Sequence, residues 1–262
     1  MTDTVFVVYL ALVGAALGSF LNVCIYRWPA GLSVLRPRSR CPGCETPIAW
    51  YDNVPVLSWI LLRGRCRSCG EGISIQYPLV ELAVASIWLG MALWLGPGLE
   101  AVRGAIFLTL LFGIAIIDGR HRIIPDQLSL GGAVAGLILA ALPSTALPLI
   151  TALIGAVVGY VFMWGVKLGG EALFRKPALG VGDIHMMAMV GAFVGLGSTL
   201  LTVFLGSLLG LLIGVPIAAL KGDLQAMGTY LPLGTFLAMG GAVAYLWGEP
   251  LIQWYLGYAM PL

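Results

Sequence analysis

The amino-acid sequence has little charge. Only 10% of its 262 residues are Asp, Glu, Lys or Arg, whereas soluble domains carry roughly 25%. Hydrophobic residues account for 60% of the chain, and the net charge is only +2. Such a chain cannot cover a water-facing surface, so we expect an all-α integral membrane protein. The weak net charge gives no reason to expect a nucleic-acid partner.

The N-terminus lacks the pattern of a cleaved signal peptide. The run from Val5 to Ile25 is long enough to span a membrane and is followed by Arg27, so we expect a retained first helix. Histidine is also scarce, with only two in the chain. Cys24 lies inside the first apolar run, where an inert buried thiol is expected. The sequence therefore offers little for nucleophilic catalysis by a Ser-His or Cys-His pair.

Apolar runs recur along the chain with short breaks between them. Their lengths predict a polytopic bundle of about eight transmembrane helices. The expected helices are Val5–Tyr26, Tyr77–Leu95, Ala101–Ile117, Leu128–Leu142, Leu149–Val166, Asp183–Gly195, Thr199–Leu220 and Leu231–Tyr255. Residues 27–76 are the one polar segment large enough to fold outside the lipid. The chain is thus expected to divide into residues 1–26, the first helix, residues 27–76, a loop, and residues 77–262, the transmembrane core.

The distribution of Lys and Arg predicts the orientation in the membrane. If residues 27–76 are cytoplasmic and each helix crosses once, thirteen of the fourteen Lys and Arg residues fall inside. Only Arg103 lies near an outer end. This positive-inside bias favours a cytoplasmic loop, with both termini outside. It also places Asp118 and Asp183 at the same face of the membrane.

Four of the five cysteines form two C-x-x-C pairs, Cys41/Cys44 and Cys66/Cys69. The turns within the pairs let two thiolates face one ion, and four thiolates complete a tetrahedral zinc site. Disulfides are rare in the cytosol, although a redox pair or unligated thiols remain alternatives. Four protein ligands leave no open position. We therefore expect a structural zinc ion that staples the loop.

Asp118 and Asp183 lie at the edges of apolar runs, where a carboxylate is costly enough to suggest a function. Two close carboxyl groups share a proton, so that one activates water while the other polarises a carbonyl, as in aspartyl proteases. Gly180 and Gly182 allow close approach of a substrate strand or a neighbouring helix. Each acid also has a structural explanation. Asp183 fits an N-cap, and Asp118 and Asp126 fit a polar inner loop.

Several short stretches are more specific together than any one of them alone. They are Gly18-Ser-Phe-Leu-Asn22, Arg27-x-Pro29, the two cysteine pairs with Asn53-Val-Pro-Val-Leu-Ser-Trp59 between them, Arg63-Gly-Arg-Cys66, Ile73-Ser74, Tyr77-Pro-Leu-Val-Glu81, Ile117-Asp118, Ile124-Pro-Asp126-x-Leu128 and Gly180-x-Gly-Asp183. In this combination the chain resembles the bacterial type IV prepilin peptidases. These are bifunctional leader peptidases and N-methyltransferases among the GxGD-type intramembrane aspartyl proteases.

The resemblance implies that Asp118 and Asp183 are the catalytic pair, with Gly180, Gly182 and Asp126 in supporting roles. The implied substrates are type IV prepilins or type II secretion pseudopilins, whose short basic leader is cut after a glycine at the cytoplasmic face of the inner membrane. S-adenosylmethionine is the implied donor for methylation of the new N-terminal residue, usually Phe. Zinc on the four cysteines and membrane lipid complete the implied partners.

Two positions depart from the family pattern. His185 stands where many members have Lys, two residues after the GxGD aspartate, and an imidazole changes its charge near neutral pH. After Glu81 the chain reads Leu82-Ala-Val-Ala85, where many members have Leu-Leu-Thr-Gly in a region linked with methylation. Glu81 is therefore either an ordinary charged anchor or part of the methyl-transfer site. No glycine-rich fingerprint of the soluble methyltransferases identifies residues for the methyl donor.

A different class of protein also fits the two acids. A helical transporter or scaffold would use Asp118 and Asp183 as an ion relay, with the zinc loop docking a partner. Transporters usually place such acids near the membrane midplane and often contain repeats. Here both acids are expected at one edge, and no repeat is visible. This difference favours a peptidase.

Overall fold

The computed structural model describes residues 2–177, 179–220 and 232–259. Its helices are α1 (Thr2–Arg27), η1 (Trp50–Asn53), α2 (Leu57–Leu61), α3 (Gln76–Leu95), α4 (Leu99–His121), α5 (Asp126–Ala140), α6 (Leu149–Phe174), α7 (Val181–Leu209), η2 (Gly210–Gly214), α8 (Val215–Leu220) and α10 (Leu233–Ala259). The described residues contain two isolated β-bridges but no strand, which confirms the all-α prediction. The chain forms two compact units, residues 1–105 and 106–262, and their boundary lies within α4.

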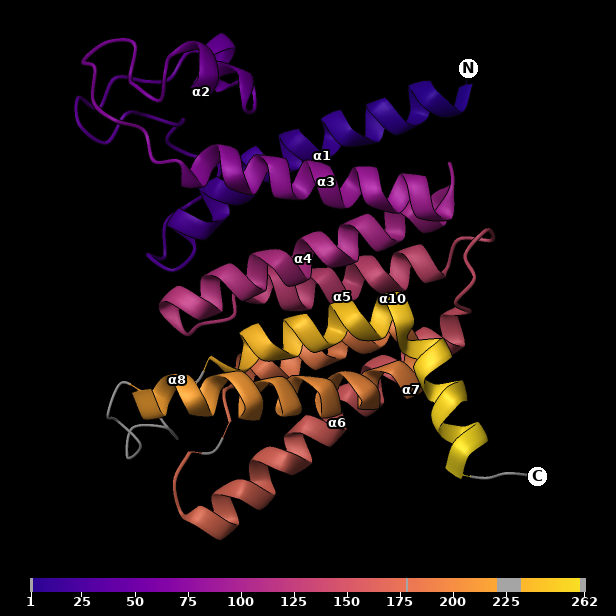
Figure 1. The fold of residues 1–262 in the computed structure, drawn as a ribbon. Coiled ribbons are helices and arrows are strands. Elements are labelled where there is room, and N and C mark those ends of the chain that lie inside the picture. Colours follow the sequence, from indigo (N-terminus) through magenta and orange to yellow (C-terminus); the bar gives the residue numbers. More distant parts are fainter. Residues whose placement is uncertain (1, 178, 221–231, 260–262) are drawn as a thin grey trace. The chain divides into compact units, whose positions relative to one another are not determined.

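In the first unit α1 packs along α3 (Figure 1). Two glycines of α1 lie where a side chain has no room. A Cβ added at Gly14 would lie 2.8 Å from the Cβ of Trp88, and one at Gly18 would lie 2.7 Å from the Cα of Glu81. The two glycines are four positions apart, so they form the G-x-x-x-G pattern that lets membrane helices approach closely.

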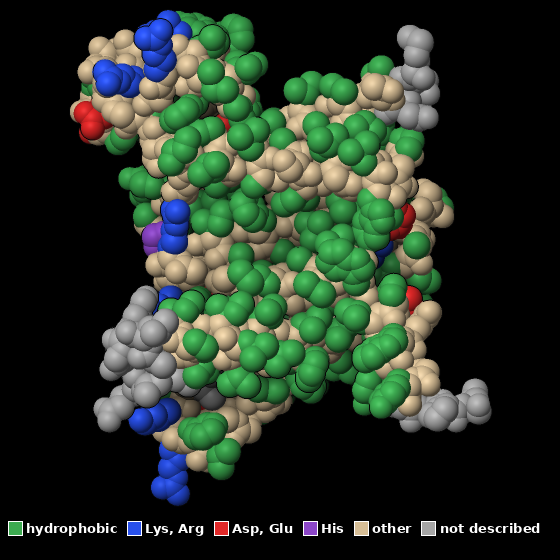
Figure 2. Space-filling view, in the orientation of Figure 1, with side chains coloured by type: hydrophobic (Ala, Val, Ile, Leu, Met, Phe, Trp, Pro, Cys, Tyr) green, Lys and Arg blue, Asp and Glu red, His purple; other side chains and the backbone are tan. Residues whose placement is uncertain are grey.

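Residues 28–75 form the loop between α1 and α3, with the short helices η1 and α2 inside it. Figure 2 shows Lys and Arg side chains on this loop, whereas hydrophobic side chains cover much of the helical surface. A helix that faces lipid satisfies its backbone groups internally and presents apolar side chains outward. The charged surface of the loop is therefore as expected for a segment exposed to water, and the apolar surface of the helices is as expected for membrane spans.

In the second unit α7 packs against α5, α6 and α10. Backbone meets backbone where α6 and α7 cross, because Gly155 lies directly against Gly191. The contact with α10 is similar, since a Cβ added at Gly240 would lie 2.7 Å from the backbone nitrogen of Gly206. Lipid tails remove the hydrophobic drive for helix association, so close packing at small residues contributes more of the stability.

The expected sixth and seventh helices are the two helical segments of α7, which meet at a kink at Gly195. This residue has φ 72° and ψ −176°, which glycine adopts at little steric cost, and the helix resumes after it. The break that the sequence predicts near Gly195 is therefore confirmed, and the second helical segment follows this kink directly, without a loop. The π-helical turn η2 follows α7 and leads into α8.

Among the described residues, five helices are long and apolar enough to cross a membrane. They are Thr4–Arg27, Gln76–Leu95, Leu99–His121, Leu149–Phe174 and Val181–Ile217, of which the last contains the bend. Helix α5 is apolar but has only 15 residues. Leu231, the expected start of the last helix, and the expected polar segment 221–223 lie outside the described residues. The chain is thus a multi-pass membrane protein, and its division at residues 26 and 76 stays a prediction.

Candidate active site and metal centre

Asp118 lies in the last turn of α4, within the second unit, and its side chain is buried. Its Oδ2 accepts two hydrogen bonds from Thr235 at the start of α10. The backbone N–H of Thr235 donates at 2.7 Å, and its hydroxyl donates at 3.1 Å. Both donors come from one residue near a helix N-terminus, where a negative charge is favoured. These bonds fix the orientation of the carboxylate and tie the end of α4 to the start of α10.

Asp183 is the third residue of α7 and is half-buried. The interpretation of Asp183 as the N-cap is wrong, because Gly180 occupies that position. The carboxylate instead reaches back to the backbone of Gly180 in the manner of a capping box. It also lies close enough to Asp118 for the two charges to interact. The structure therefore brings the two predicted acids to one end of the second unit.

Ile124, in the turn between α4 and α5, contacts a residue close to each of the two acids. A Cβ added at Gly182, next to Asp183, would lie 2.8 Å from the Cβ of Ile124. A Cβ added at Gly234 would lie 2.6 Å from the Cδ1 of Ile124 and 3.1 Å from the carboxyl group of Asp118. Both glycines are thus needed for space. Gly182 admits the neighbouring turn, whereas Gly180 is exposed beside Asp183.

Asp126, at the start of α5, contacts neither of the two acids in a hydrogen bond. Its Oδ1 instead lies 2.8 Å from Nδ1 of His185, on the first turns of α7. The imidazole also stacks on the ring of Tyr160 from α6, with centroids 6.2 Å apart. The sequence singled out Asp126 and His185 separately, and the structure pairs them.

Sequence reasoning missed Thr235, Gly234 and Ile124. Thr235 is an ordinary Thr near the start of an apolar run, more than a hundred residues from its partner Asp118. Ile124 belongs to the Ile124-Pro-Asp126 stretch but is apolar, so it carried no chemical signal. The one local signal is the Gly234-Thr235 pair, in which a small residue precedes a hydroxyl-bearing residue at the start of a helix. This pattern is typical of a helix N-terminus that another group approaches.

The four paired cysteines of the first unit gather in one cluster. Their sulfur atoms all lie within 4.8 Å of one another. Across the two pairs, Sγ of Cys41 lies 3.7 Å from Sγ of Cys69, and Sγ of Cys44 lies 4.0 Å from Sγ of Cys66. A tetrahedron with Zn–S bonds of about 2.3 Å requires sulfurs about 3.8 Å apart. The cluster therefore fits a zinc site with four thiolate ligands, as the sequence predicted.

The two cysteine turns repeat the same backbone pattern 25 positions apart. In each, the N–H of the first cysteine donates to a carbonyl five residues later, and the residue after the second cysteine has a positive φ. These features are Cys41 to Thr46 at 3.0 Å, Cys66 to Glu71 at 2.8 Å, and φ values of 56° at Glu45 and 76° at Gly70. The two turns therefore present their cysteines in the same local geometry.

The surroundings shift the pKa values of two thiols of the cluster in opposite directions. The hydroxyl of Thr46 and then its backbone N–H lower the pKa of the Cys44 thiol to about 6. For Cys69, the backbone N–H of Glu71 acts in the same direction, but Cys44, burial and the other thiols outweigh it and raise the pKa to about 12. Four adjacent thiols resist complete ionisation, so a cation is the natural partner for the set.

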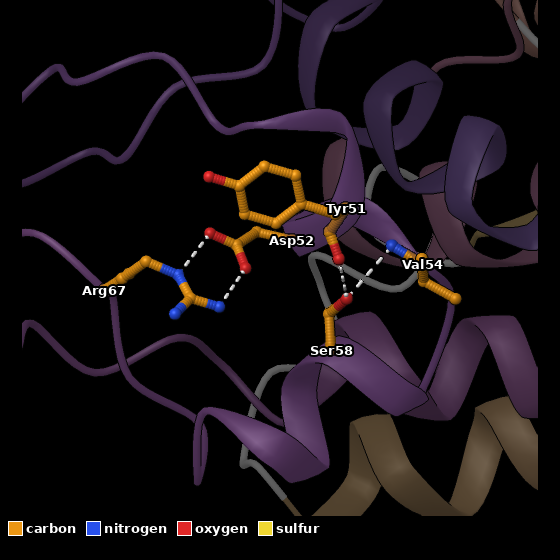
Figure 3. A network of polar contacts seen from close by, with 5 residues as sticks. All are labelled: Tyr51, Asp52, Val54, Ser58 and Arg67. Carbon is orange, nitrogen blue, oxygen red and sulfur yellow. Dashed lines mark hydrogen bonds and ion pairs between the residues drawn. The ribbon is translucent and has the colours of Figure 1, made fainter.

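Polar contacts hold the segment between the two cysteine turns (Figure 3). The guanidinium group of Arg67 donates to both oxygens of Asp52, from Nε at 2.8 Å and from Nη2 at 2.6 Å. This hydrogen-bonded ion pair lowers the pKa of the Asp52 carboxyl. The hydroxyl of Ser58 donates to the carbonyl of Tyr51 and accepts from the N–H of Val54, both at 3.0 Å. These bonds connect η1 to α2 and to the second cysteine turn.

Glu81 of α3 is buried and joins the loop to the helices of the first unit. Its Oε2 accepts a 2.7 Å hydrogen bond from the N–H of Val56, just before α2. Val56 has φ 62°, which is strained for a β-branched residue. Glu81 thus stabilises a strained turn. The sequence was consistent with Glu81 as a charged anchor or as part of the methyl-transfer site, and this contact gives Glu81 a structural role.

These features define a polytopic membrane protein with a pair of acids at the ends of its helices and a metal site of four cysteines. Two family models match the chain. Residues 12–95 match the bacterial peptidase A24 N-terminal domain, and residues 105–215 match the type IV leader peptidase family. The chain belongs to the type IV leader peptidase family, so the resemblance inferred from the sequence is confirmed.

Curated relatives cover nearly the whole chain, and each is named prepilin leader peptidase/N-methyltransferase. The one from Aeromonas salmonicida is 34% identical over 92% of this chain and 90% of its own length. The one from Pseudomonas putida is 34% identical over 96% and 94%, and the one from Xanthomonas campestris pv. campestris is 36% identical over 94% and 93%. No solved structure matches the chain.

Proposed function

We propose that this protein cleaves the short basic leader of type IV prepilins and N-methylates the residue exposed by the cut. The observation that carries the proposal is the meeting of Asp118 and Asp183 at one end of the second unit. Family membership and the names of the relatives support the same activity. An ion relay remains the other use of two such acids, and no observation favours it.

Cleavage follows from what two adjacent carboxyl groups do together. One carboxylate takes a proton from water, and the resulting hydroxide attacks the carbonyl carbon of the scissile bond. The other carboxyl group, protonated, donates to the carbonyl oxygen. The tetrahedral intermediate then collapses, and the leaving amine takes a proton from the pair. Thr235 holds Asp118 for this exchange, and Ile124 packs against Gly182, the neighbour of Asp183.

The proposed substrates include type II secretion pseudopilins as well as type IV prepilins. In both, an apolar helix follows the cut, which suits an enzyme whose acids lie at the ends of membrane spans. We propose that this end and the zinc loop face the cytoplasm and that both termini are external, on the grounds of the distribution of Lys and Arg. Lipid of the inner membrane would surround the helices.

S-adenosylmethionine supplies the methyl group when it is bound. One cavity of the first unit, of about 380 Å³, lies between α1 and the loop. Its lining contains Arg27 and Arg38 but no Asp or Glu. The donor carries a sulfonium and an ammonium group against one carboxylate, so two guanidinium groups are a poor match for its net positive charge. The residues of this cavity do not fit the donor, and we assign none of them to it.

The proposal is tested with purified protein in liposomes, a prepilin, and S-adenosylmethionine. Intact-mass spectrometry reports loss of the leader and addition of a methyl group as separate changes. The expected result is a mature pilin carrying one methyl group. An unprocessed prepilin under conditions in which the enzyme is folded would reject the peptidase function. A cleaved but unmethylated product would reject the methyltransferase function alone.

Thr235→Val is expected to lower kcat for leader cleavage about 10-fold, because a hydrogen bond to a charged group contributes roughly 1.5 kcal/mol. The backbone N–H still holds Asp118, so activity is not abolished. Thr235→Ser keeps the hydroxyl and should retain most of the wild-type kcat. Steady-state kinetics with a prepilin substrate measure both. Equal kcat values for the Val and Ser variants would contradict the role of the hydroxyl.

A further inference from the structure

The turn before α5 contacts α7 at two points that lie on either side of Asp183. On one side, Ile124 packs against Gly182. On the other, Asp126 hydrogen-bonds His185. Residues 182 and 185 flank the acid within a single helical turn, so the position of Asp183 depends on both contacts. Ile124 also touches Gly234, next to the residue that holds Asp118. A shift of this turn would therefore move the two acids relative to one another.

We propose that the Asp126–His185 pair is a charged strap that positions Asp183 for leader cleavage, and that it makes the reaction sensitive to the charge of the imidazole. This inference rests on the proposed function and deepens it. His185 is a positioning residue, because its contacts run to Asp126 and Tyr160 and not to either acid of the pair.

The surroundings of His185 suit such a strap. Asp126 faces the imidazole from α5 and Tyr160 faces it from α6, while Asp183 lies two positions away on α7. The His185 side chain is 17% exposed and that of Asp126 is 64% exposed. The ring of Tyr160 stacks on the half-buried imidazole and holds it in place. Protonated His185 donates through Nδ1 to the carboxylate.

The charge on His185 decides the strength of the strap. An imidazole loses its charge between about pH 5 and pH 8, whereas a Lys ammonium keeps it across that range. A partly exposed ion pair contributes little to stability. Its larger effect is on geometry, because a small displacement of a catalytic group costs up to about 10²-fold in rate.

The first experiment asks whether the pair is coupled, and it does not depend on activity. Thermal unfolding is measured for wild type, Asp126→Asn, His185→Gln and the double variant, at pH 6 and at pH 8.5. At pH 6 the double variant should be no less stable than either single variant, and at pH 8.5 the coupling should shrink. Additive losses at both values of pH would overturn the strap. His121→Gln is the matched control, because it removes the only other histidine of the chain, which is exposed.

The second experiment measures kcat and KM for a prepilin substrate between pH 5.5 and pH 8.5. His185→Gln and Asp126→Asn should lower kcat by up to about 10²-fold with little change in KM. His185→Lys should retain most of the activity, and the ratio of wild-type kcat to His185→Lys kcat should fall as the pH rises. A constant ratio, or full kcat in His185→Gln, would overturn the positioning role. If wild type cleaves no prepilin, the proposed function fails, and the unfolding measurements still decide the strap.

Discussion

Asparagine at position 183 is expected to lower kcat for leader cleavage by roughly 10²- to 10⁴-fold, which is the contribution of one positioned acid–base group. Asn has the shape of Asp and suits the first turn of a helix, so α7 should still form. Its amide oxygen can accept the hydrogen bond from Gly180, but the amide neither takes nor gives the proton that cleavage requires. Single-turnover kinetics with a reconstituted variant measure the loss.

The control for this substitution is Glu249→Gln. Glu249 is an exposed acid of α10 that accepts a 2.7 Å hydrogen bond from Gln253, and Gln at this position keeps that bond. It belongs to no part of the candidate site. The control should cleave at the wild-type rate. Wild-type kcat in Asp183→Asn would remove this acid from the mechanism.

Loss of one cysteine ligand is expected to remove the metal from the protein. Cys41→Ser and Cys66→Ser each leave three thiols in a site whose metal is expected to hold the loop together. Binding of structural zinc contributes about 10–16 kcal/mol in small zinc-finger peptides, and the loop has few other buried groups to replace it. Metal analysis of purified variants should show less than stoichiometric zinc, and limited proteolysis should cut residues 28–75 faster.

Cys24→Ala is the matched control for the zinc substitutions. Cys24 is a buried thiol of α1 that lies outside the cluster. This variant should retain one zinc per chain and a protected loop. Wild-type protein that contains no stoichiometric zinc, or a metal-depleted loop that resists proteolysis as well as the native one, would contradict a structural metal site.

The helices and the two acids could be predicted from the sequence, because each follows from neighbouring residues or from the summed distribution of many residues. Long apolar runs follow from the thickness of the membrane. The clustering of Lys and Arg predicts an orientation that places Asp118 and Asp183 at one face of the membrane. The break at Gly195 was also predicted, but the form of the connection between the two helical segments was not. A Gly-Leu-Gly break is equally consistent with a loop and with a kink, and packing against neighbouring helices decides between them.

The partners of the acids could not be predicted, because each depends on a contact between distant segments. Thr235 meets Asp118 through the packing of α10 against the end of α4, and the local Gly234-Thr235 pattern does not identify Asp118 as the partner. The Asp126–His185 pair likewise joins two helix starts. The cysteine site was different, since ligand type and spacing alone specify it. Its repeated turns were present in the sequence but became evident only from their hydrogen bonds.

Whether Asp118 and Asp183 act as one catalytic unit is tested most directly by measuring kcat for Asp118→Asn, Asp183→Asn and the double variant. When two residues share one proton, replacing either one removes the function of both, so kcat of the double variant should be no lower than that of either single variant. This result is expected because the two carboxyl groups lie at one end of the second unit, close enough for their charges to interact. Losses that multiply in the double variant would show that the two acids act independently and would contradict an aspartyl pair.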